Sequence, residues 1–186
     1  INDFLERYPE LSIEIFVRDS IGDFVGEGTD VAIRFGEPGG HSLHAELLLE
    51  TRVFTCASTQ YLERYGKPQV PADLFHVHQC VLIRDPATGR PFAWEFQRRG
   101  EAVPFAASGR VTVNDTGSLI AACRSGAGIA QLLELYVRDE LAGGDLIQIL
   151  PDWAEETFPL HAYYRRSELM PAKLRVFLDF VREIVA

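Results

Sequence analysis

The sequence lacks the features that define several protein classes. No apolar run approaches the length of a membrane span, and no basic start precedes an apolar stretch, so neither a membrane segment nor a signal peptide is visible. Cysteine is scarce, and Cys56, Cys80 and Cys123 are widely spaced, without a CxxC or Cys/His metal pattern. These absences predict free thiols in a reducing cytoplasm, with no metal site and no membrane partner.

Catalytic motifs are also missing. The sequence has no G-x-S-x-G, no P-loop and no H-E-x-x-H. Gly126 and Gly128 form only half of a dinucleotide fingerprint, and they follow an expected helix rather than a strand, so they predict a helix end. An enzyme interpretation therefore has no nucleophile, base or cofactor loop, and we expect neither catalysis nor a cofactor.

Basic residues are too few for direct nucleic-acid binding. The chain has 18 Lys and Arg against 27 Asp and Glu, which gives a net charge of -9. The only basic clusters are Arg98-Arg99 and Arg165-Arg166, and both are short. DNA binding depends on clustered cations that neutralise phosphates, so any DNA contact by the whole protein must come from another segment.

Residues 1–35 show an alternation of helices and strands. Phe4, Leu5 and Tyr8 have helical spacing before Pro9, and residues 11–17 alternate apolar and polar like a strand. A second helix is expected over 20–27, followed by an all-apolar strand over 31–33 of the kind that parallel sheets bury on both faces. Such short alternating elements predict an open α/β sheet.

This stretch resembles the effector-binding domain of LysR-type transcriptional regulators. Similarity continues through residues 53–80, 114–132 and 149–153, so it covers essentially the whole chain. The matching residues at the start are Tyr8, Pro9, Glu10, Asp23, Val25, Glu27, Gly28, Asp30, Val31, Ala32, Ile33 and Arg34.

The resemblance implies a specific α/β fold. It has two Rossmann-like lobes joined by two crossing strands, like a type II periplasmic binding protein, and lobe I here is expected to lack its first strand. Lobe I comprises residues 1–56 and 157–186, and lobe II comprises 57–156. The family's N-terminal helix-turn-helix domain, which binds DNA, is absent from this chain.

Local signals place the elements of lobe II. Ser58 and Asp115 are expected helix N-caps, and Gly66 is expected to end the first of these helices. Residues 97–102, QRRGEA, are interpreted as a polar loop between two strands. Connections near residues 53–57 and 153–159 would form a cleft between the lobes, where open α/β sheets bind ligands.

Two arginines are candidate effector ligands. Arg34 ends one expected strand and Arg18 ends its neighbour, so their guanidinium groups could hold a carboxylate in a bidentate manner. The alternative is that each pairs with a local acid such as Asp19 or Asp30. We expect Phe35, Gly36 and Ala57 to line the same site, with Phe35 and Ala57 offering apolar surface.

The helix start near residue 115 is a second candidate. Asn114, Asp115 and Thr116 stand where free backbone N–H groups favour an anion, and this position lines the effector pocket in the resembled family. Capping is the alternative role of Asp115 and Thr116. Gln131, a polar residue in a buried strand, is interpreted either as a cleft-facing amide or as a satisfied core hydrogen bond.

Two further residue sets favour structural roles. His76 and His78 share a face in an extended segment, but no third ligand accompanies them, which disfavours a metal. Cys56 lies at a crossing and could sense oxidants, but buried structural thiols are far commoner.

We expect a bacterial regulatory sensor whose effector is a small carboxylate or aromatic anion. The domain is expected to form a homodimer or tetramer, with residues 21–25 and 116–124 as candidate contacts, and to reach DNA only through the absent N-terminal domain. The alternative is a freestanding solute-binding protein or lyase with the same two-lobed fold.

Overall fold

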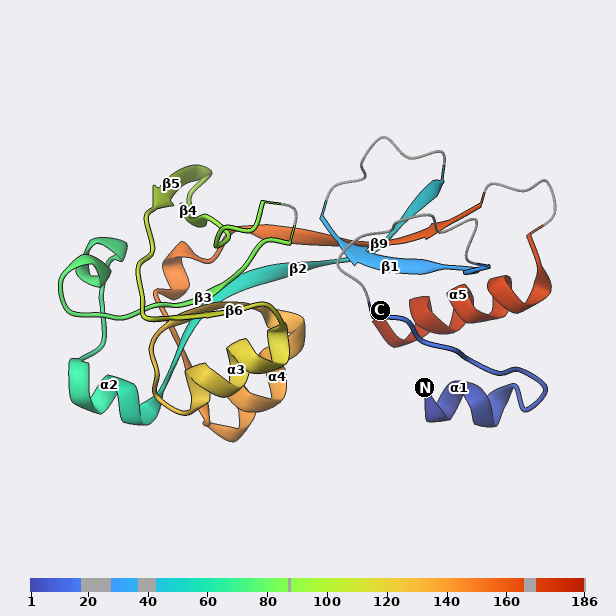
Figure 1. The fold of residues 1–186 in the computed structure, drawn as a ribbon, viewed down its shortest axis with the longest axis horizontal. Coiled ribbons are helices and arrows are strands. Elements are labelled where there is room, and N and C mark those ends of the chain that lie inside the picture. The colour runs from blue at the N-terminus through green and yellow to red at the C-terminus, as the bar shows by residue number, and fades with distance from the viewer. Residues whose placement is uncertain (18–27, 37–42, 87, 166–169, 186) are drawn as a thin grey trace. The chain divides into compact units, whose positions relative to one another are not determined.

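The computed structural model describes residues 1–17, 28–36, 43–86, 88–165 and 170–185 (Figure 1). Its contacts divide the chain into unit 1, Ile1–Glu50 with Pro159–Ala186, and unit 2, Thr51–Phe158. The expected lobe boundaries lay after residues 56 and 156, whereas residues 51–56 here belong to unit 2. Pairing explains this, because Val53 to Cys56 align with Leu133 to Ala130 of unit 2. The expected helix over 20–27 lies outside the described residues.

The described chain contains both helices and strands. The α-helices are α1 (Asn2–Arg7), α2 (Thr59–Tyr65), α3 (Thr116–Arg124), α4 (Glu134–Gly143) and α5 (Ala172–Val185), with short 3-10 helices η1 (Pro71–Phe75) and η2 (Pro151–Trp153). The strands are β1 (Ala32–Phe35), β2 (His44–Ser58), β3 (Val81–Ile83), β4 (Trp94–Arg98), β5 (Glu101–Phe105), β6 (Val111–Val113), β7 (Ala130–Leu133), β8 (Leu146–Ile149) and β9 (Thr157–Tyr164). By their bounds, β2 and β9 each run from one unit into the other.

Unit 1 is built on the antiparallel pair of β1 and β9. Leu174 and Leu178 of α5 pack against Ala162 and Tyr164 of β9. Phe4, the buried residue of α1, meets α5 edge-on at Phe180, with ring centroids 5.3 Å apart. The terminal helices of the chain are therefore joined through an aromatic contact.

Two expectations for unit 1 were wrong. Residues 11–17 form no strand, although their apolar residues alternate as expected, and Val17 is 95% exposed. Alternation suits a strand only when a neighbouring strand supplies the hydrogen bonds, and the pattern does not show whether one does. The apolar run 31–33 does lead into β1, but β1 pairs antiparallel and Ile33 is 43% exposed, rather than buried in a parallel sheet.

The described part of unit 2 contains four strand pairings and its own apolar core. Strand β2 pairs antiparallel with both β7 and β8, and β3 pairs parallel with β6. Helices α3 and α4 cover these strands (Figure 1), and Leu119, Cys123 and Val137 of the two helices pack with Phe54, Leu132 and Leu146. A second cluster gathers Trp94, Phe96 and Phe105 of the remaining pair, β4 and β5.

The expected polar loop over 97–102 is instead the end of a β-hairpin. Strand β4 runs to Arg98, and β5 begins at Glu101. Arg99 and Gly100 have φ angles of 53° and 74°, and positive φ at both central residues is the geometry of a tight type I′ turn. Arg-Gly is a weaker signal for this turn than Asn-Gly, so the sequence did not predict the hairpin.

The expected helix caps are confirmed. The Ser58 hydroxyl accepts a hydrogen bond from Tyr61 N–H, and Gly66 ends α2 at a φ of 83°. Gly126, at a φ of 80°, follows α3 as expected. Gly128 has a further role, because a Cβ there would lie 2.5 Å from the Gln79 carbonyl oxygen, which accepts a hydrogen bond from Ile129 N–H.

Candidate functional site

In unit 1, three predicted residues stand together at the end of β1. Arg34 and Phe35 are half-buried and lie opposite His161 and Leu160 of β9. Gly36 turns the chain at a φ of 101°, and its N–H donates to the Pro159 carbonyl at 2.9 Å. His161 Nδ1 lies 3.0 Å from the Gly36 carbonyl oxygen. These contacts fix the backbone that follows Arg34 and Phe35. Arg18 lies outside the described residues.

In unit 2, the start of α3 gathers Asn114, Asp115 and Thr116. Asn114 and Asp115 are exposed and Thr116 is half-buried. The Asp115 carboxylate accepts a hydrogen bond from Ser118 N–H at 2.8 Å, which confirms the capping role. Hydrogen bonds from the side chain and backbone of Ser118 lower the pKa of Asp115, so the cap is ionised at neutral pH. The negative charge is thus held at the helix start itself.

The remaining two predicted residues have structural contacts within unit 2. Gln131 Nε2 donates to the Glu95 carbonyl at 2.9 Å, which matches the hydrogen-bonded alternative for this residue. Ala57 is fully buried in the cluster that contains Tyr61 and Ile149. Both residues therefore contribute to the packing of unit 2. The Gln131 amide also has an oxygen that can accept a hydrogen bond.

The sequence did not predict the coupling between two carboxylates, those of Glu95 and Glu156. Burial and, to a lesser extent, the charge of Glu95 together raise the pKa of Glu156 to about 7. Glu95 Oε1 accepts a hydrogen bond from Gln97 Nε2 at 2.7 Å. Since Glu95 and Glu156 are far apart in sequence and follow no motif, only the folded chain shows this coupling. Glu156 therefore changes charge near neutral pH.

The three cysteines are buried and free. Burial raises the pKa of all three thiols, to about 11 for Cys80 and about 12 for Cys123, and further still for Cys56. Cys123 Sγ donates to the Cys56 carbonyl at 3.3 Å. Thiols in this state are protonated and poor nucleophiles, which favours a structural role for Cys56 over oxidant sensing.

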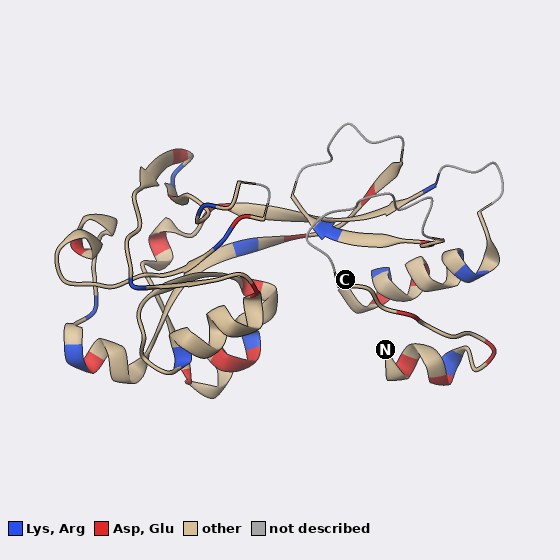
Figure 2. Cartoon of the chain, viewed as in Figure 1, with Lys and Arg blue, Asp and Glu red and all other residues tan. Residues whose placement is uncertain are grey.

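Metal, membrane and charge features are limited. In the described part of the chain, no group of three or more His, Cys, Asp and Glu side chains could hold a metal ion. No helix within the described ranges is both long and apolar enough to cross a membrane. Figure 2 shows basic and acidic positions interspersed along the described elements rather than segregated.

Comparison with known proteins assigns the family. The model of the LysR substrate binding domain matches residues 1–186. The chain belongs to this family. As a LysR substrate binding domain it is 32% identical, over 186 residues, to the probable HTH-type transcriptional regulator LtrA of Klebsiella pneumoniae. That match covers 98% of this chain and 59% of LtrA, so the chain spans about three fifths of that relative.

Solved structures of other members of the LysR family agree with the fold. The regulatory domain of CrgA, a LysR-type regulator from Neisseria meningitidis, matches with a TM-score of 0.86 and 30% identity, over 100% of this chain and 89% of that one. The full-length virulence activator AphB of Vibrio cholerae matches with a TM-score of 0.81 and 29% identity, over 98% of this chain and 61% of that one. The type II periplasmic-binding-protein-like α/β fold expected from the sequence is therefore confirmed.

Proposed function

We propose that this chain is the effector-sensing part of a transcriptional regulator whose DNA-binding part lies in another segment. The observation that carries the proposal is the family match along residues 1–186. The relatives named above are transcriptional regulators, and a net charge of -9 disfavours DNA contact by this chain itself. The alternative, a freestanding solute-binding protein or lyase, has no support among these relatives. Such a regulator would act in the cytoplasm, where its DNA is.

The proposed effector is a small carboxylate or aromatic anion. Arg34 supplies a guanidinium beside a fixed turn, and such a group binds carboxylates in a bidentate manner. Phe35 and Gly36 would contact the body of the effector, while Asn114 and Thr116 flank the N–H groups at the start of α3. Because the Asp115 carboxylate is engaged with Ser118, it does not need to face the effector.

Gln131 and Ala57 are assigned a supporting role in this proposal. The Gln131 amide is anchored on Glu95, and Ala57 is buried in the core. Arg18 remains a proposed second guanidinium for the effector. Unequal affinity for two arrangements of the domain would then transmit binding to the DNA-binding part.

Self-association is part of the proposal, as a homodimer or a tetramer. The outer face of α3 is a candidate contact, because Gly117, Ser118, Ala121 and Arg124 are exposed while Leu119 faces the core. The other candidate, residues 21–25, lies outside the described residues. A two-fold contact through α3 would use the same patch on both copies.

A thermal-shift screen of small carboxylates and aromatic anions tests the effector class. A ligand that binds the folded chain raises its melting temperature by mass action. We expect hits among these anions, and none among amines and sugars of matched size. A screen in which only amines or sugars stabilise the chain would contradict the proposed effector class.

A further inference from the structure

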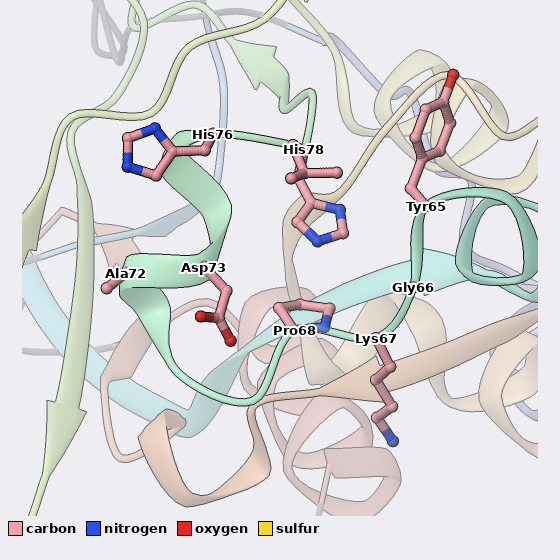
Figure 3. A pocket seen from close by; sticks show the side chains of 9 residues that line it. Tyr65, Gly66, Lys67, Pro68, Ala72, Asp73, His76 and His78 are labelled. Carbon is pink, nitrogen blue, oxygen red and sulfur yellow. The ribbon is translucent and has the colours of Figure 1, made fainter.

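A surface hollow in unit 2 is lined by none of the residues predicted to bind the effector. It has a volume of about 550 Å³, within the usual range of small-molecule sites. Residues from the end of α2, from η1 and from the segment that follows η1 line it (Figure 3). They include Tyr65, Lys67, Pro68, Asp73, Val77 and His78.

His78, which lines this hollow, has an enclosed ring nitrogen that lacks a hydrogen-bond partner in the described part of the chain. The side chain is only 7% exposed, and its Nδ1 finds no hydrogen-bond partner among the described residues. Its ring is tilted against Tyr61, with the centroids 5.8 Å apart. Burial lowers the pKa of His78, against an opposing effect from the charge of Asp73. A buried polar atom without a partner is costly, so a shift of the ring that lets a ligand atom pair with this nitrogen would gain stability.

Side chains of opposite charge are among those that line the hollow. Figure 3 shows Asp73 and Lys67 flanking Pro68, with the His78 ring beside them. Asp73 Oδ2 accepts hydrogen bonds from Gln69 N–H at 2.8 Å and from Val70 N–H at 3.1 Å. These backbone bonds lower the pKa of Asp73 and hold its carboxylate in place. A carboxylate has roughly four acceptor positions, so capacity remains for a ligand.

A second hollow has no unmet buried polar group among its described lining residues. It is lined by Ala121, Arg124, Ser125 and Asp145. Its charged groups satisfy each other, because Arg124 donates to the Asp145 carboxylate at 2.6 Å. That hollow therefore offers a useful control for charge effects without an unmet buried group.

We propose that the His78 hollow is a second ligand site, which binds a small zwitterion of the amino-acid type. The ligand carboxylate contacts Lys67, and its ammonium group contacts Asp73. Its apolar body lies against Tyr65 and Val77, both of which are exposed enough to be covered. A shift of the His78 ring lets one polar atom of the ligand complete its hydrogen bonding. This site is separate from the proposed effector residues, so either can fail alone.

The test is an NMR titration of the 186-residue chain with L-leucine. Isocaproate, which lacks the amine, and isoamylamine, which lacks the carboxylate, are titrated in parallel. L-leucine is expected to shift the His78 imidazole signals and the amide signals of residues 65–78 saturably, and each single-charge analogue to bind about tenfold more weakly. Equal binding by isocaproate or isoamylamine, or no saturable shift with L-leucine, would overturn the proposal and leave a hollow filled by water.

Matched variants separate the site from the scaffold. Lys67→Gln and Asp73→Asn are each expected to weaken L-leucine about tenfold, and Asn retains the acceptor that holds the loop. Lys173→Gln in unit 1 and Asp145→Asn at the other hollow remove the same charges elsewhere, and should leave binding unchanged. Wild-type affinity in both Lys67→Gln and Asp73→Asn, or equal losses in the control variants, would refute the assignment.

Discussion

The Asp115 carboxylate accepts a hydrogen bond from the backbone N–H of Ser118 at 2.8 Å. The negative charge of Asp115 would oppose anion binding if it faced the ligand. This contact instead engages the carboxylate at the first turn of α3, where it caps the helix. The remaining N–H groups of that turn stay oriented outward from the helix start. The relationship also makes the stability of α3 depend on one exposed side chain.

Replacing Asp115 should therefore destabilise the chain. Asp115→Ala removes the acceptor and leaves Ser118 N–H without it, so the melting temperature should fall by a few degrees. Asp115→Ser keeps a capping oxygen and should remain near wild type. Asp139→Ala, at an exposed position of α4, is the control. Thermal unfolding that gives the same midpoint for Asp115→Ala and Asp139→Ala would contradict the capping role.

Glu156 should make the chain less stable as pH rises. Its pKa in the folded chain is about 7, above its ordinary value of 4.5. Between these values the folded chain binds more protons than the unfolded chain, so the free energy of unfolding falls with rising pH. Glu156→Gln should remove this loss and stabilise the chain at pH 8 by on the order of 1–2 kcal/mol. Urea unfolding at several pH values measures it.

The neighbouring residue provides a control of opposite sign. Hydrogen bonds from the backbone of Arg99 and Gly100 lower the pKa of Glu155. Its contribution to stability is present above the ordinary pKa and is lost as pH falls through the lowered one. Glu155→Gln should therefore weaken the chain at neutral pH. If Glu155→Gln and Glu156→Gln change the pH dependence of the free energy of unfolding in the same direction, the charges of these residues do not act as described.

The cysteines should react only after unfolding. Cys56, Cys80 and Cys123 are buried, and burial raises their pKa values, so the native chain contains almost no thiolate at pH 8. Labelling with a thiol reagent should be slow in buffer and complete in urea. Rapid labelling of even one cysteine in the native chain would reopen oxidant sensing as a function of this domain.

Local chemistry accounts for the elements that the sequence predicted well. Ser58 and Asp115 cap their helices through hydrogen bonds three residues away, and Gly66 ends a helix through its own φ angle. Such signals need no knowledge of the rest of the fold. Strand partners are different, since β1 pairs with residues more than a hundred positions away. The pattern of residues 11–17 thus predicted a strand that the structure does not form. Strand β5 was not predicted, because Arg-Gly is a weak turn signal.

In the candidate site too, local motifs were predictable, whereas properties that depend on distant residues were not. The family resemblance supplied Arg34 and the start of α3, because these residues belong to continuous motifs. The role of Gln131 depended on the Glu95 carbonyl, and the raised pKa of Glu156 depended on burial and on that same residue. The unmet Nδ1 of His78 likewise arises from packing. None of these properties follows from residue type or spacing alone.

Calorimetry on the Arg34→Ala variant tests the central claim most directly. An anion identified by the thermal-shift screen is titrated into the wild type, into Arg34→Ala and into Arg138→Ala, whose arginine is exposed on α4. If Arg34 holds a carboxylate, its loss should weaken binding by roughly 2 to 5 kcal/mol, while Arg138→Ala binds like the wild type. Unchanged affinity in Arg34→Ala would transfer this residue from the effector site to the scaffold and contradict the account.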